Sequence, residues 1–262
     1  MNIAQVLSSS GLDPREARLL LAAATGFSEA SVLAFQEKII PGEAQALFTE
    51  FASRRKTGEP VAYILGRKEF YGLELAVNPA VLIPRPETEL LVELALQRDF
   101  SSAVDLGTGC GAIALALKKH RPRARVVAVE ASAAALAVAR RNAVKHSLEV
   151  DFRHGRWLKP LRAELFDLIV SNPPYVALGD PHLAALRFEP AEALIGGRDG
   201  LDAIRELARQ APARLAPGGR LLLEHGMGQD GAVRELLAAA GLEEVQSWPD
   251  LAGIPRVSGG KR

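Results

Sequence analysis

Residues 166–176 read Phe-Asp-Leu-Ile-Val-Ser-Asn-Pro-Pro-Tyr-Val, an apolar run that ends abruptly in two prolines. A short, bounded apolar run such as Phe166–Val170 is typical of a buried strand in a parallel sheet. Proline has no N–H, and the residue before a proline is kept out of the helical region. Residues 172–174 are therefore predicted to form a stiff, extended segment just beyond the carboxyl end of a strand, where open α/β sheets bind ligands.

The groups of this segment can hold a planar –NH2 group. Asn172 offers a carbonyl acceptor and two N–H donors, Pro173 offers a backbone carbonyl, and Tyr175 offers a flat aromatic face. Acceptors beside a flat face suit a carboxamide or the exocyclic amine of a nucleic-acid base. A loop that merely contains turn residues stays open as the simpler interpretation, because Pro and Asn are common in turns.

The composition indicates an ordinary globular protein. The 262 residues are 48% hydrophobic and 24% charged, and a formal net charge of +1 gives no bulk electrostatic reason to bind nucleic acid or an anionic membrane. Cys110 is the single cysteine, so an intrachain disulfide is impossible and a reducing compartment fits. We expect a cytoplasmic protein without a membrane span, and no metal centre because the His residues have no Cys nearby.

The N-terminal part is predicted to be helical up to residue 57. Asp13 and Pro14 are typical of a helix start, and further helices are expected over residues 28–35 and Gly42–Lys56. A small structural bundle is the simplest interpretation of these helices. A recognition module for a macromolecular substrate is the functional alternative.

A different pattern follows the helices. Ala62–Gly66 is expected to be extended, and residues 68–83 are predicted to form a β-hairpin that links two domains, with Val81–Ile83 as a short strand. A helix is then expected to start within Pro84–Glu89 and to run to about residue 98, since glutamates in a first turn suit the helix dipole.

From residue 101 the sequence alternates between strand and helix patterns. The predicted strands are Ala103–Leu106, Arg125–Val129, Leu148–Phe152, Phe166–Val170 and Arg220–Leu223. The predicted helices are Gly111–His120, Ser132–His146, Leu201–Leu215 and Gln229–Ala240, and a final antiparallel pair is expected from Glu243–Trp248 and Arg256–Val257. Repeated strand–helix units predict an α/β fold with a parallel sheet and helices on both faces.

A glycine-rich loop connects the first of these strands to its helix. Residues 105–112 read Asp-Leu-Gly-Thr-Gly-Cys-Gly-Ala, and glycines let a backbone pass close to a ligand. Glu130 ends the next strand, where an acid can bind the hydroxyls of a ribose. The spacing of Gly107, Gly109 and Ala112 fits the dinucleotide-binding pattern, and it fits the loop of adenosylmethionine-dependent methyltransferases equally well.

Three features favour the methyltransferase interpretation. Asp105 precedes the loop, where an acid suits the cationic amino group of a methionine moiety. Gly111 opens the turn further, and the Asn-Pro-Pro-Tyr tetrad at residues 172–175 has no use in a dehydrogenase. Trp157 follows the third strand, where it either stacks on an adenine or simply packs.

With both motifs, and over nearly its whole length, the chain resembles the protein-glutamine N5-methyltransferases that modify class 1 peptide-chain release factors, the HemK/PrmC family. The segments that carry the resemblance are Glu59–Gly66, Glu69–Gly72, Leu82–Glu89, Asp105–Ala112, Asn172–Tyr175, Glu189-Pro190 and Gly197–Leu201. The tetrad alone is weak evidence for the substrate, because DNA and RNA amino-methyltransferases carry similar tetrads. The block from Ile83 to Glu89 together with the helical N-terminal domain is more specific.

The resemblance implies a Rossmann-like, seven-stranded class I methyltransferase sheet in residues 84–262. It also implies a helical substrate-recognition domain in residues 1–67 and a β-hairpin linker at residues 68–83. The implied cofactor is S-adenosyl-L-methionine, which leaves as S-adenosyl-L-homocysteine, with no metal. The implied partner is a class 1 release factor, methylated on the glutamine of a Gly-Gly-Gln loop by a monomeric, cytoplasmic enzyme that binds no nucleic acid stably and no membrane.

The resemblance also implies a role for individual residues. The cofactor site would comprise Asp105, Gly107, Thr108, Gly109, Cys110, Gly111, Glu130, Trp157 and Asn172. The substrate site would comprise Asn172, Pro173, Pro174 and Tyr175, of which Asn172, Pro173 and Tyr175 would act in the transfer. Three positions depart from the family pattern: Glu130 replaces the usual Asp, Arg156 stands where an acid is frequent, and Cys110 replaces Ser or Thr. We interpret Cys110 as a small loop residue and not as a nucleophile.

Other functions stay open on the sequence alone. A DNA or RNA amino-methyltransferase would use nearly the same chemistry, although the near-zero net charge and the lack of a basic, aromatic-rich segment argue against it. A nucleotide-binding module without turnover and a dehydrogenase are further alternatives.

Overall fold

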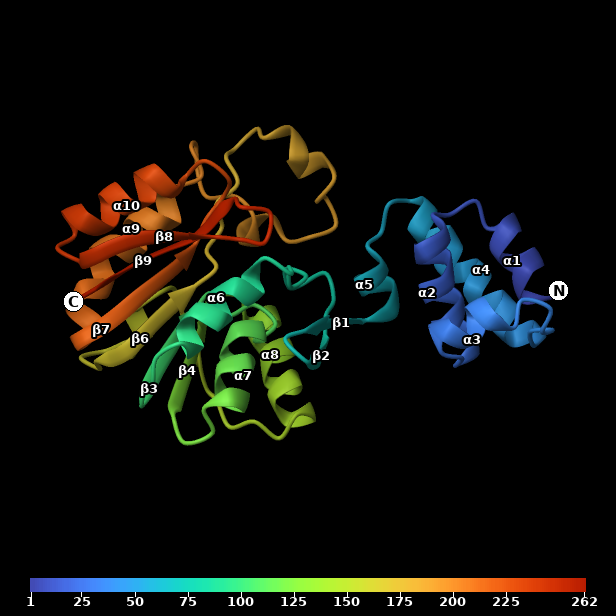
Figure 1. The fold of residues 1–262 in the computed structure, drawn as a ribbon, viewed down its shortest axis with the longest axis horizontal. Coiled ribbons are helices and arrows are strands. Elements are labelled where there is room, and N and C mark those ends of the chain that lie inside the picture. Colours follow the sequence, from blue (N-terminus) through green and yellow to red (C-terminus); the bar gives the residue numbers. More distant parts are fainter. The chain divides into compact units, whose positions relative to one another are not determined.

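The computed structural model describes residues 1–262 and divides into two compact units, Met1–Arg67 and Lys68–Arg262 (Figure 1). We call them the N-terminal unit and the C-terminal unit, and each is described by itself.

Helices form the N-terminal unit: α1 (Ile3–Ser9), α2 (Pro14–Thr25), α3 (Glu29–Ala34), α4 (Gly42–Lys56) and α5 (Val61–Leu65). The predicted start of α2 is confirmed, because the Asp13 side chain accepts hydrogen bonds from the backbone N–H groups of Arg15 and Glu16. The apolar faces of the helices meet in one core, which includes Ile3, Leu20, Leu21, Val32 and Phe48.

The prediction that Ala62–Gly66 is extended is wrong, since this segment forms α5. Pro60 precedes the helix and Gly66 ends it in the left-handed conformation, with a φ of 68°. Val, Tyr and Ile favour strands when considered alone, but the helical turn buries Tyr63 and Ile64. Burial of these side chains outweighs the local strand preference.

The β-hairpin is shorter than predicted. It consists of β1 (Arg67–Phe70) and β2 (Leu73–Ala76), joined by a turn in which Tyr71 and Gly72 both have positive φ. The strand expected at Val81–Ile83 is absent. The backbone N–H of Ile83 donates instead to the carboxylate of Glu189, at 3.0 Å, so a side chain takes the place of a partner strand.

Seven strands form the sheet of the C-terminal unit: β3 (Ser102–Leu106), β4 (Arg125–Glu130), β5 (Asp151–His154), β6 (Phe166–Ser171), β7 (Leu215–Glu224), β8 (Glu243–Pro249) and β9 (Pro255–Lys261). Their order is β5-β4-β3-β6-β7-β9-β8. The strands from β5 to β7 are parallel, and β9 is antiparallel to both β7 and β8. The predicted parallel sheet and final antiparallel pair are confirmed, although β5 begins three residues later than expected.

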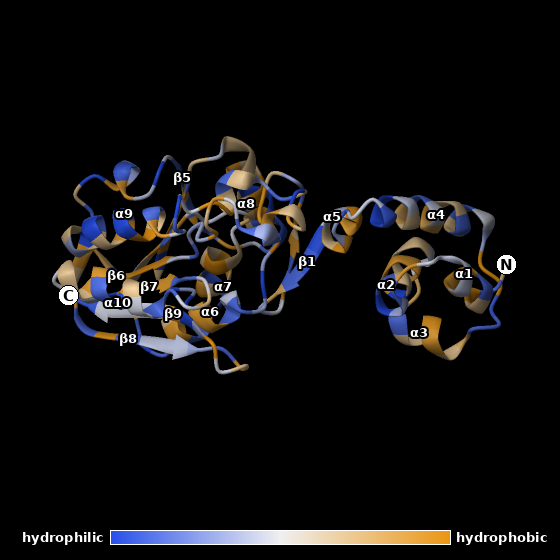
Figure 2. Ribbon diagram, turned by 90° about the horizontal axis from the view of Figure 1, so that it is seen from above, coloured by the Kyte–Doolittle hydropathy of each residue, from blue (hydrophilic) through white to orange (hydrophobic).

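Five α-helices surround this sheet: α6 (Thr88–Leu96), α7 (Ala112–His120), α8 (Ala133–Lys145), α9 (Asp202–Gln210) and α10 (Asp230–Ala239). Short 3-10 turns lie at Lys159–Leu161, Pro181–Ala184, Ala191–Ala193 and Ala211–Arg214. One buried cluster joins the central strands to α9 and α10, and α7 packs on β3 and β4. Figure 2 shows hydrophobic residues concentrated in β6 and more hydrophilic ones in the edge strand β8.

The strand order places a crevice between β3 and β6. The chain leaves β3 for β4 and β5 on one side, then returns to build β6 and β7 on the other side. In such a sheet, ligands bind outside the carboxyl ends of the two strands at this reversal. The Ser171 hydroxyl donates to the Leu106 carbonyl at 2.6 Å, which ties these two strand ends together.

No helix in the structure combines the length and the apolar character needed to cross a membrane.

Asn142, fully buried on α8, connects the hairpin to the glycine loop. Its side-chain N–H groups donate to the carbonyls of Ala76 and Cys110, and its oxygen accepts from the N–H of Ala76. We predict that Asn142→Ala lowers the free energy of unfolding by about 2–4 kcal/mol, because buried backbone groups lose their partners. Urea denaturation would measure the loss. Arg141→Ala, an exposed change on the same helix, is the control, and equal stability of the two variants would contradict the prediction.

Candidate functional site

The glycine loop follows the carboxyl end of β3 and leads directly into α7. Gly107, Gly109 and Gly111 all have positive φ, at 74°, 57° and 90°, a conformation that favours glycine. The N–H groups of Gly107 and Thr108 both donate to the Val129 carbonyl of the neighbouring strand. A Cβ added at Gly109 would meet no atom within 4 Å, so this side of the loop faces open space.

Asp105 lies beneath this loop and is fully buried. One carboxylate oxygen accepts from the Thr108 hydroxyl at 2.5 Å and from the Ala114 N–H at 3.2 Å. The other oxygen has no hydrogen-bond partner. Burial raises the pKa of the Asp105 carboxyl to about 7. The site therefore holds an unsatisfied acceptor that a cationic donor would stabilise.

Glu130 ends β4 and anchors the same loop. One of its oxygens accepts from the Gly109 N–H at 2.8 Å, and the other accepts from the Ser132 N–H at 2.9 Å. Each carboxylate oxygen can accept a second hydrogen bond. Glu130 can thus hold the loop and still receive hydroxyl donors from a ligand.

Trp157 packs directly against the glycine loop. A Cβ added at Gly107 would lie 3.2 Å from the indole ring, a tight contact, and the φ of 74° at this position also favours glycine. The indole N–H donates to the carboxylate of Glu206 at 3.1 Å, and the Arg156 guanidinium binds the same carboxylate at 3.0 Å. Glu206, on α9, therefore fixes the ring and also pairs with the arginine that replaces the usual acid. The sequence contains no pattern that singles out this residue.

Cys110 is buried within the loop, and burial raises the pKa of its thiol to about 12. Such a thiol stays protonated at neutral pH and lacks the thiolate that a nucleophile requires.

The tetrad follows the carboxyl end of β6, next to the loop. The Asn172 amide nitrogen donates to the Thr88 hydroxyl at 3.1 Å, while its oxygen and the Pro173 carbonyl accept no hydrogen bond. The Tyr175 hydroxyl donates to the buried carboxylate of Glu224 at 3.2 Å. The tetrad therefore offers two acceptors without partners, and the bond to Glu224 fixes the nearby Tyr175 hydroxyl.

Two glycines support the backbone of the tetrad. A Cβ added at Gly196 would lie 2.4 Å from the Pro174 carbonyl oxygen, and one added at Gly200 would lie 2.2 Å from the Tyr175 carbonyl oxygen. The Gln229 side chain also donates to the Tyr175 carbonyl, at 3.1 Å. The glycines of the 196–200 loop are thus required by close packing against the tetrad.

Arg85 and Glu189, whose roles the sequence leaves undefined, form an ion pair. The Glu189 side chain is almost fully buried and also accepts from the Ile83 N–H. These contacts connect the segment from Ile83 to Glu89 with the segment that follows the tetrad, although the two lie about 100 residues apart in the sequence.

Sequence reasoning missed Thr88 and Glu224 as members of the site. Thr88 lies at the start of α6, and Glu224 ends β7. Glu224 could have been recognised as an acidic residue directly after a predicted strand, which is the pattern that indicated Glu130. Thr88 carried no signal of its own beyond its place in the 82–89 block.

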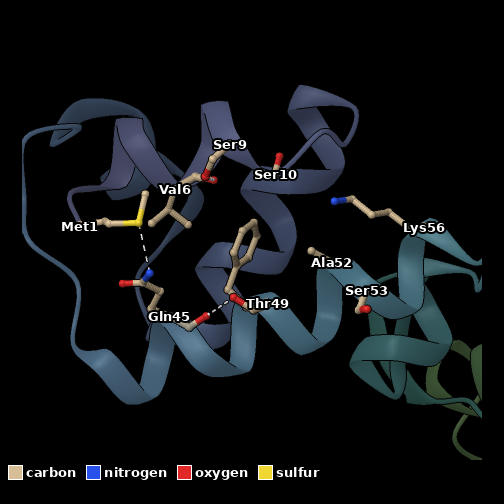
Figure 3. A pocket seen from close by; sticks show the side chains of 10 residues that line it. Met1, Val6, Ser9, Ser10, Gln45, Thr49, Ala52, Ser53 and Lys56 are labelled. Carbon is tan, nitrogen blue, oxygen red and sulfur yellow. Dashed lines mark hydrogen bonds between the residues drawn. The ribbon is translucent and has the colours of Figure 1, made fainter.

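Cavities also lie away from this site. Figure 3 shows one of about 180 Å³ in the N-terminal unit, where residues of α1 and α4 meet and the Gln45 amide donates to the Met1 sulfur. A second, of about 860 Å³, lies at the amino ends of β4 and β5 and includes Arg125 and Asp151. Neither contains the loop or the tetrad. The structure contains no cluster of three or more His, Cys, Asp or Glu side chains suited to a metal ion.

Two family models match separate parts of the chain. The one described as "Methyltransferase small domain" matches residues 86–188, and the one described as "PrmC N-terminal domain" matches residues 2–66.

Curated relatives match nearly the whole chain. The chain is 47% identical over 268 residues to a release factor glutamine methyltransferase from Neisseria gonorrhoeae. The aligned region covers 100% of this chain and 98% of that relative. It is 48% identical over 252 residues to a release factor glutamine methyltransferase from Pseudomonas aeruginosa. The aligned region covers 94% of this chain and 91% of that relative.

Solved structures show the same fold. A methyltransferase from Pyrococcus furiosus has a TM-score of 0.60 at 21% identity and covers 81% of this chain and 98% of its own. A 16S rRNA methyltransferase from T. thermophilus, in complex with AdoMet and guanosine, has a TM-score of 0.55 at 25% identity and covers 75% of this chain and 49% of its own. The sheet of the C-terminal unit is therefore a class I methyltransferase sheet.

The close contact between Gly196 and the Pro174 carbonyl can be tested by substitution. We predict that Gly196→Ala lowers the free energy of unfolding by about 1–3 kcal/mol, because the new Cβ forces the Pro174 carbonyl aside. Gly231→Ala is the matched control: its Cβ meets open space on α10, and it should be neutral or stabilising by up to about 1 kcal/mol. Urea denaturation would compare them, and a Gly196 variant as stable as the control would refute the prediction.

Proposed function

This chain belongs to the release factor glutamine methyltransferase family, and from that premise we propose that it methylates the side-chain amide nitrogen of the glutamine in the Gly-Gly-Gln loop of a class 1 peptide-chain release factor. The observation that carries this proposal is the identity of 47% to a family member across the whole chain. The methyl donor is S-adenosylmethionine. The products are N5-methylglutamine and S-adenosylhomocysteine.

The residues around the glycine loop suit this donor. The unpartnered oxygen of Asp105 would receive the ammonium of the methionine part, and Glu130 would accept from the ribose hydroxyls. Gly107, Thr108, Gly109, Cys110 and Gly111 would let the backbone approach the ligand, and Trp157 would lie against the adenine. When bound, the donor supplies a methyl group on a positively charged sulfur, which is open to attack by a nucleophile.

The tetrad would orient the target amide. An amide nitrogen is a poor nucleophile because its lone pair is delocalised into the carbonyl group. The Asn172 side-chain oxygen and the Pro173 carbonyl would each accept one N–H of the glutamine amide, which fixes the nitrogen for attack on the methyl carbon. Correct positioning of two reactants alone can supply several kcal/mol, up to about 7–11 kcal/mol.

Tyr175 and Pro174 would complete the substrate site. The Tyr175 ring would pack on the plane of the amide, held by the bond from its hydroxyl to Glu224. Asn172 would also border the donor, because the end of β6 lies beside the glycine loop. As the new N–C bond forms, the S–C bond breaks and its electrons return to sulfur, and the nitrogen releases one proton to solvent water.

We propose that residues 1–67 recognise the release factor, that residues 68–83 link the two domains, and that residues 84–262 perform the transfer. We further propose a cytoplasmic monomer that binds neither nucleic acid stably nor a membrane. Methylation of a nucleic-acid base is not favoured, because the curated relatives quoted above are named for release factor glutamine.

Methyl transfer to a release factor is the direct test. The purified protein should transfer labelled methyl from S-adenosylmethionine to a class 1 release factor, and not to the same factor whose Gly-Gly-Gln glutamine is changed to alanine. Asn172→Ala should lower kcat at least about a hundredfold, because the amide loses an acceptor and its orientation. Scintillation counting of the precipitated factor would measure both effects.

Label on neither factor, with donor binding intact, would contradict the proposed substrate. Near-normal transfer by Asn172→Ala would contradict the proposed role of the tetrad.

The buried carboxyl of Asp105 predicts how donor affinity depends on pH. Since its pKa is about 7 in the free protein and an adjacent ammonium favours the carboxylate, the donor should bind the ionised form more tightly. The Kd for S-adenosylmethionine should therefore rise as the pH falls through 7, by up to about tenfold per pH unit. Calorimetric titration between about pH 5.5 and 7.5 would measure the slope. Asp105→Asn should bind more weakly with a nearly flat profile, and an unchanged slope in that variant would exclude Asp105 as the cause.

A further inference from the structure

Tyr175 is held at two points by one short segment, residues 224–229, which connects β7 to α10. Its hydroxyl donates to the buried carboxylate of Glu224 at 3.2 Å, and its backbone carbonyl accepts from the side-chain nitrogen of Gln229 at 3.1 Å. In the same segment, a Cβ added at Gly226 would lie 3.4 Å from the Tyr175 ring, so the backbone of Gly226 lies close to the ring edge. A shift of Tyr175 would therefore break a contact to this segment.

The Gln229 carboxamide uses both of its ends in this connection. Its oxygen accepts from the Gly226 N–H at 2.8 Å. Its nitrogen donates to the Tyr175 carbonyl and, more weakly, to the Asp199 carbonyl at 3.5 Å. One side chain thus joins the turn before α10, the tetrad and the 196–200 loop. Because its oxygen and nitrogen both have partners inside the protein, Gln229 is placed to act through Tyr175 and not by binding the substrate itself.

The start of α10 does not account for a glutamine at this position. Gln229 is the N-cap residue of α10, yet its side chain makes no capping bond to the helix. Ser, Thr, Asp or Asn would stabilise the helix start better. The backbones of Gly200 and Gly226 also approach this side chain closely, since added Cβ atoms would lie 2.7 Å from its nitrogen and 3.0 Å from its oxygen. The bridge to the tetrad explains both the residue type and this close approach.

Resting on the proposed function, we infer that Gln229 is a positioning residue that fixes the backbone at Tyr175 and thereby the ring that packs on the target amide. The bridge requires a donor on one side and an acceptor on the other, which a carboxamide supplies. A role in packing alone requires only a side chain of this length and shape. The two roles therefore differ in which substitutions they tolerate.

Two substitutions separate these roles in the methyl-transfer assay at saturating donor and release factor. Gln229→Met keeps the length of the side chain but removes both hydrogen-bonding groups, and its kcat should fall about tenfold to a hundredfold. Gln229→Glu keeps the acceptor for Gly226 but turns a carboxylate oxygen toward the Tyr175 carbonyl, so its kcat at neutral pH should fall at least as far. Gln97→Glu, the same change at an exposed position after α6, is the control and should keep wild-type activity.

The pH profile of Gln229→Glu provides a signature of the lost donor. A protonated carboxyl can donate to the Tyr175 carbonyl, so acid restores the hydrogen bond that the substitution removes. The facing carbonyl disfavours the charged form, which raises the pKa of the introduced carboxyl. The kcat of Gln229→Glu relative to wild type should therefore rise at least about threefold from about pH 7.5 to about pH 5.5, whereas the ratio for Gln97→Glu stays constant.

Ionisable groups already present near this side chain do not produce that signature. Asp199 and Asp230 each pair with an arginine, which lowers the pKa of the carboxyl, so both stay ionised over this range. Burial raises the pKa of Glu224 to about 7 and lowers the pKa of His225. The titration of these two groups is common to variant and wild type and cancels in the ratio.

Wild-type protein that leaves the release factor unlabelled would overturn the proposed function and this inference together. With an active wild type, the inference alone is overturned if Gln229→Met stays within about twofold of the wild-type kcat, or if the ratio for Gln229→Glu does not rise as the pH falls. If Gln229→Met fails to fold, the pH profile of Gln229→Glu still decides.

Donor binding separates positioning from a general loss of structure. Since the glycine loop and Glu130 follow β3 and β4, calorimetric titration should give both Gln229 variants an S-adenosylmethionine Kd within about twofold of wild type. A Kd that weakens in parallel with kcat would contradict a positioning role for Gln229.

Discussion

The parallel pairing of β3 with β6 is the constraint on which the site depends. These strands are 60 or more residues apart in sequence, yet Asp105 pairs in register with Val170, so the glycine loop and the tetrad begin at the same edge of the sheet. The bond from the Ser171 hydroxyl to the Leu106 carbonyl closes this junction. Under the proposed function, a donor held at one strand end and an amide held at the other would therefore lie next to each other at this edge.

Buried carboxyl groups lie on β3, at this junction, and at the end of β7, the next strand after β6. Asp105 and Glu224 each have one oxygen without a partner, and burial raises the pKa of each carboxyl to about 7. Burying such a group without full compensation costs free energy, and an apolar side chain would avoid that cost. Their retention at the edge of the sheet is understandable if Asp105 receives a ligand cation and Glu224 holds the Tyr175 hydroxyl in place.

Local patterns were sufficient to predict the order of strands and helices, the glycine loop and the tetrad. They failed where a distant partner decides the outcome. Ala62–Gly66 is helical because the N-terminal core buries Ile64, and Val81–Ile83 is not a strand because Glu189 binds its backbone. Thr88 and Glu224 could not be assigned for the same reason: the contact of Thr88 with Asn172 spans 84 positions and that of Glu224 with Tyr175 spans 49, and no local spacing encodes them.

Two independent mechanisms fix the tetrad, and they act on different parts of it. Close packing against Gly196 and Gly200 holds the carbonyls of Pro174 and Tyr175, so the backbone has one position. Packing alone cannot distinguish the two ends of the Asn172 amide, because its oxygen and nitrogen are nearly equal in size. Only a hydrogen bond can make that distinction, and the Thr88 hydroxyl oxygen accepts one from the Asn172 nitrogen at 3.1 Å.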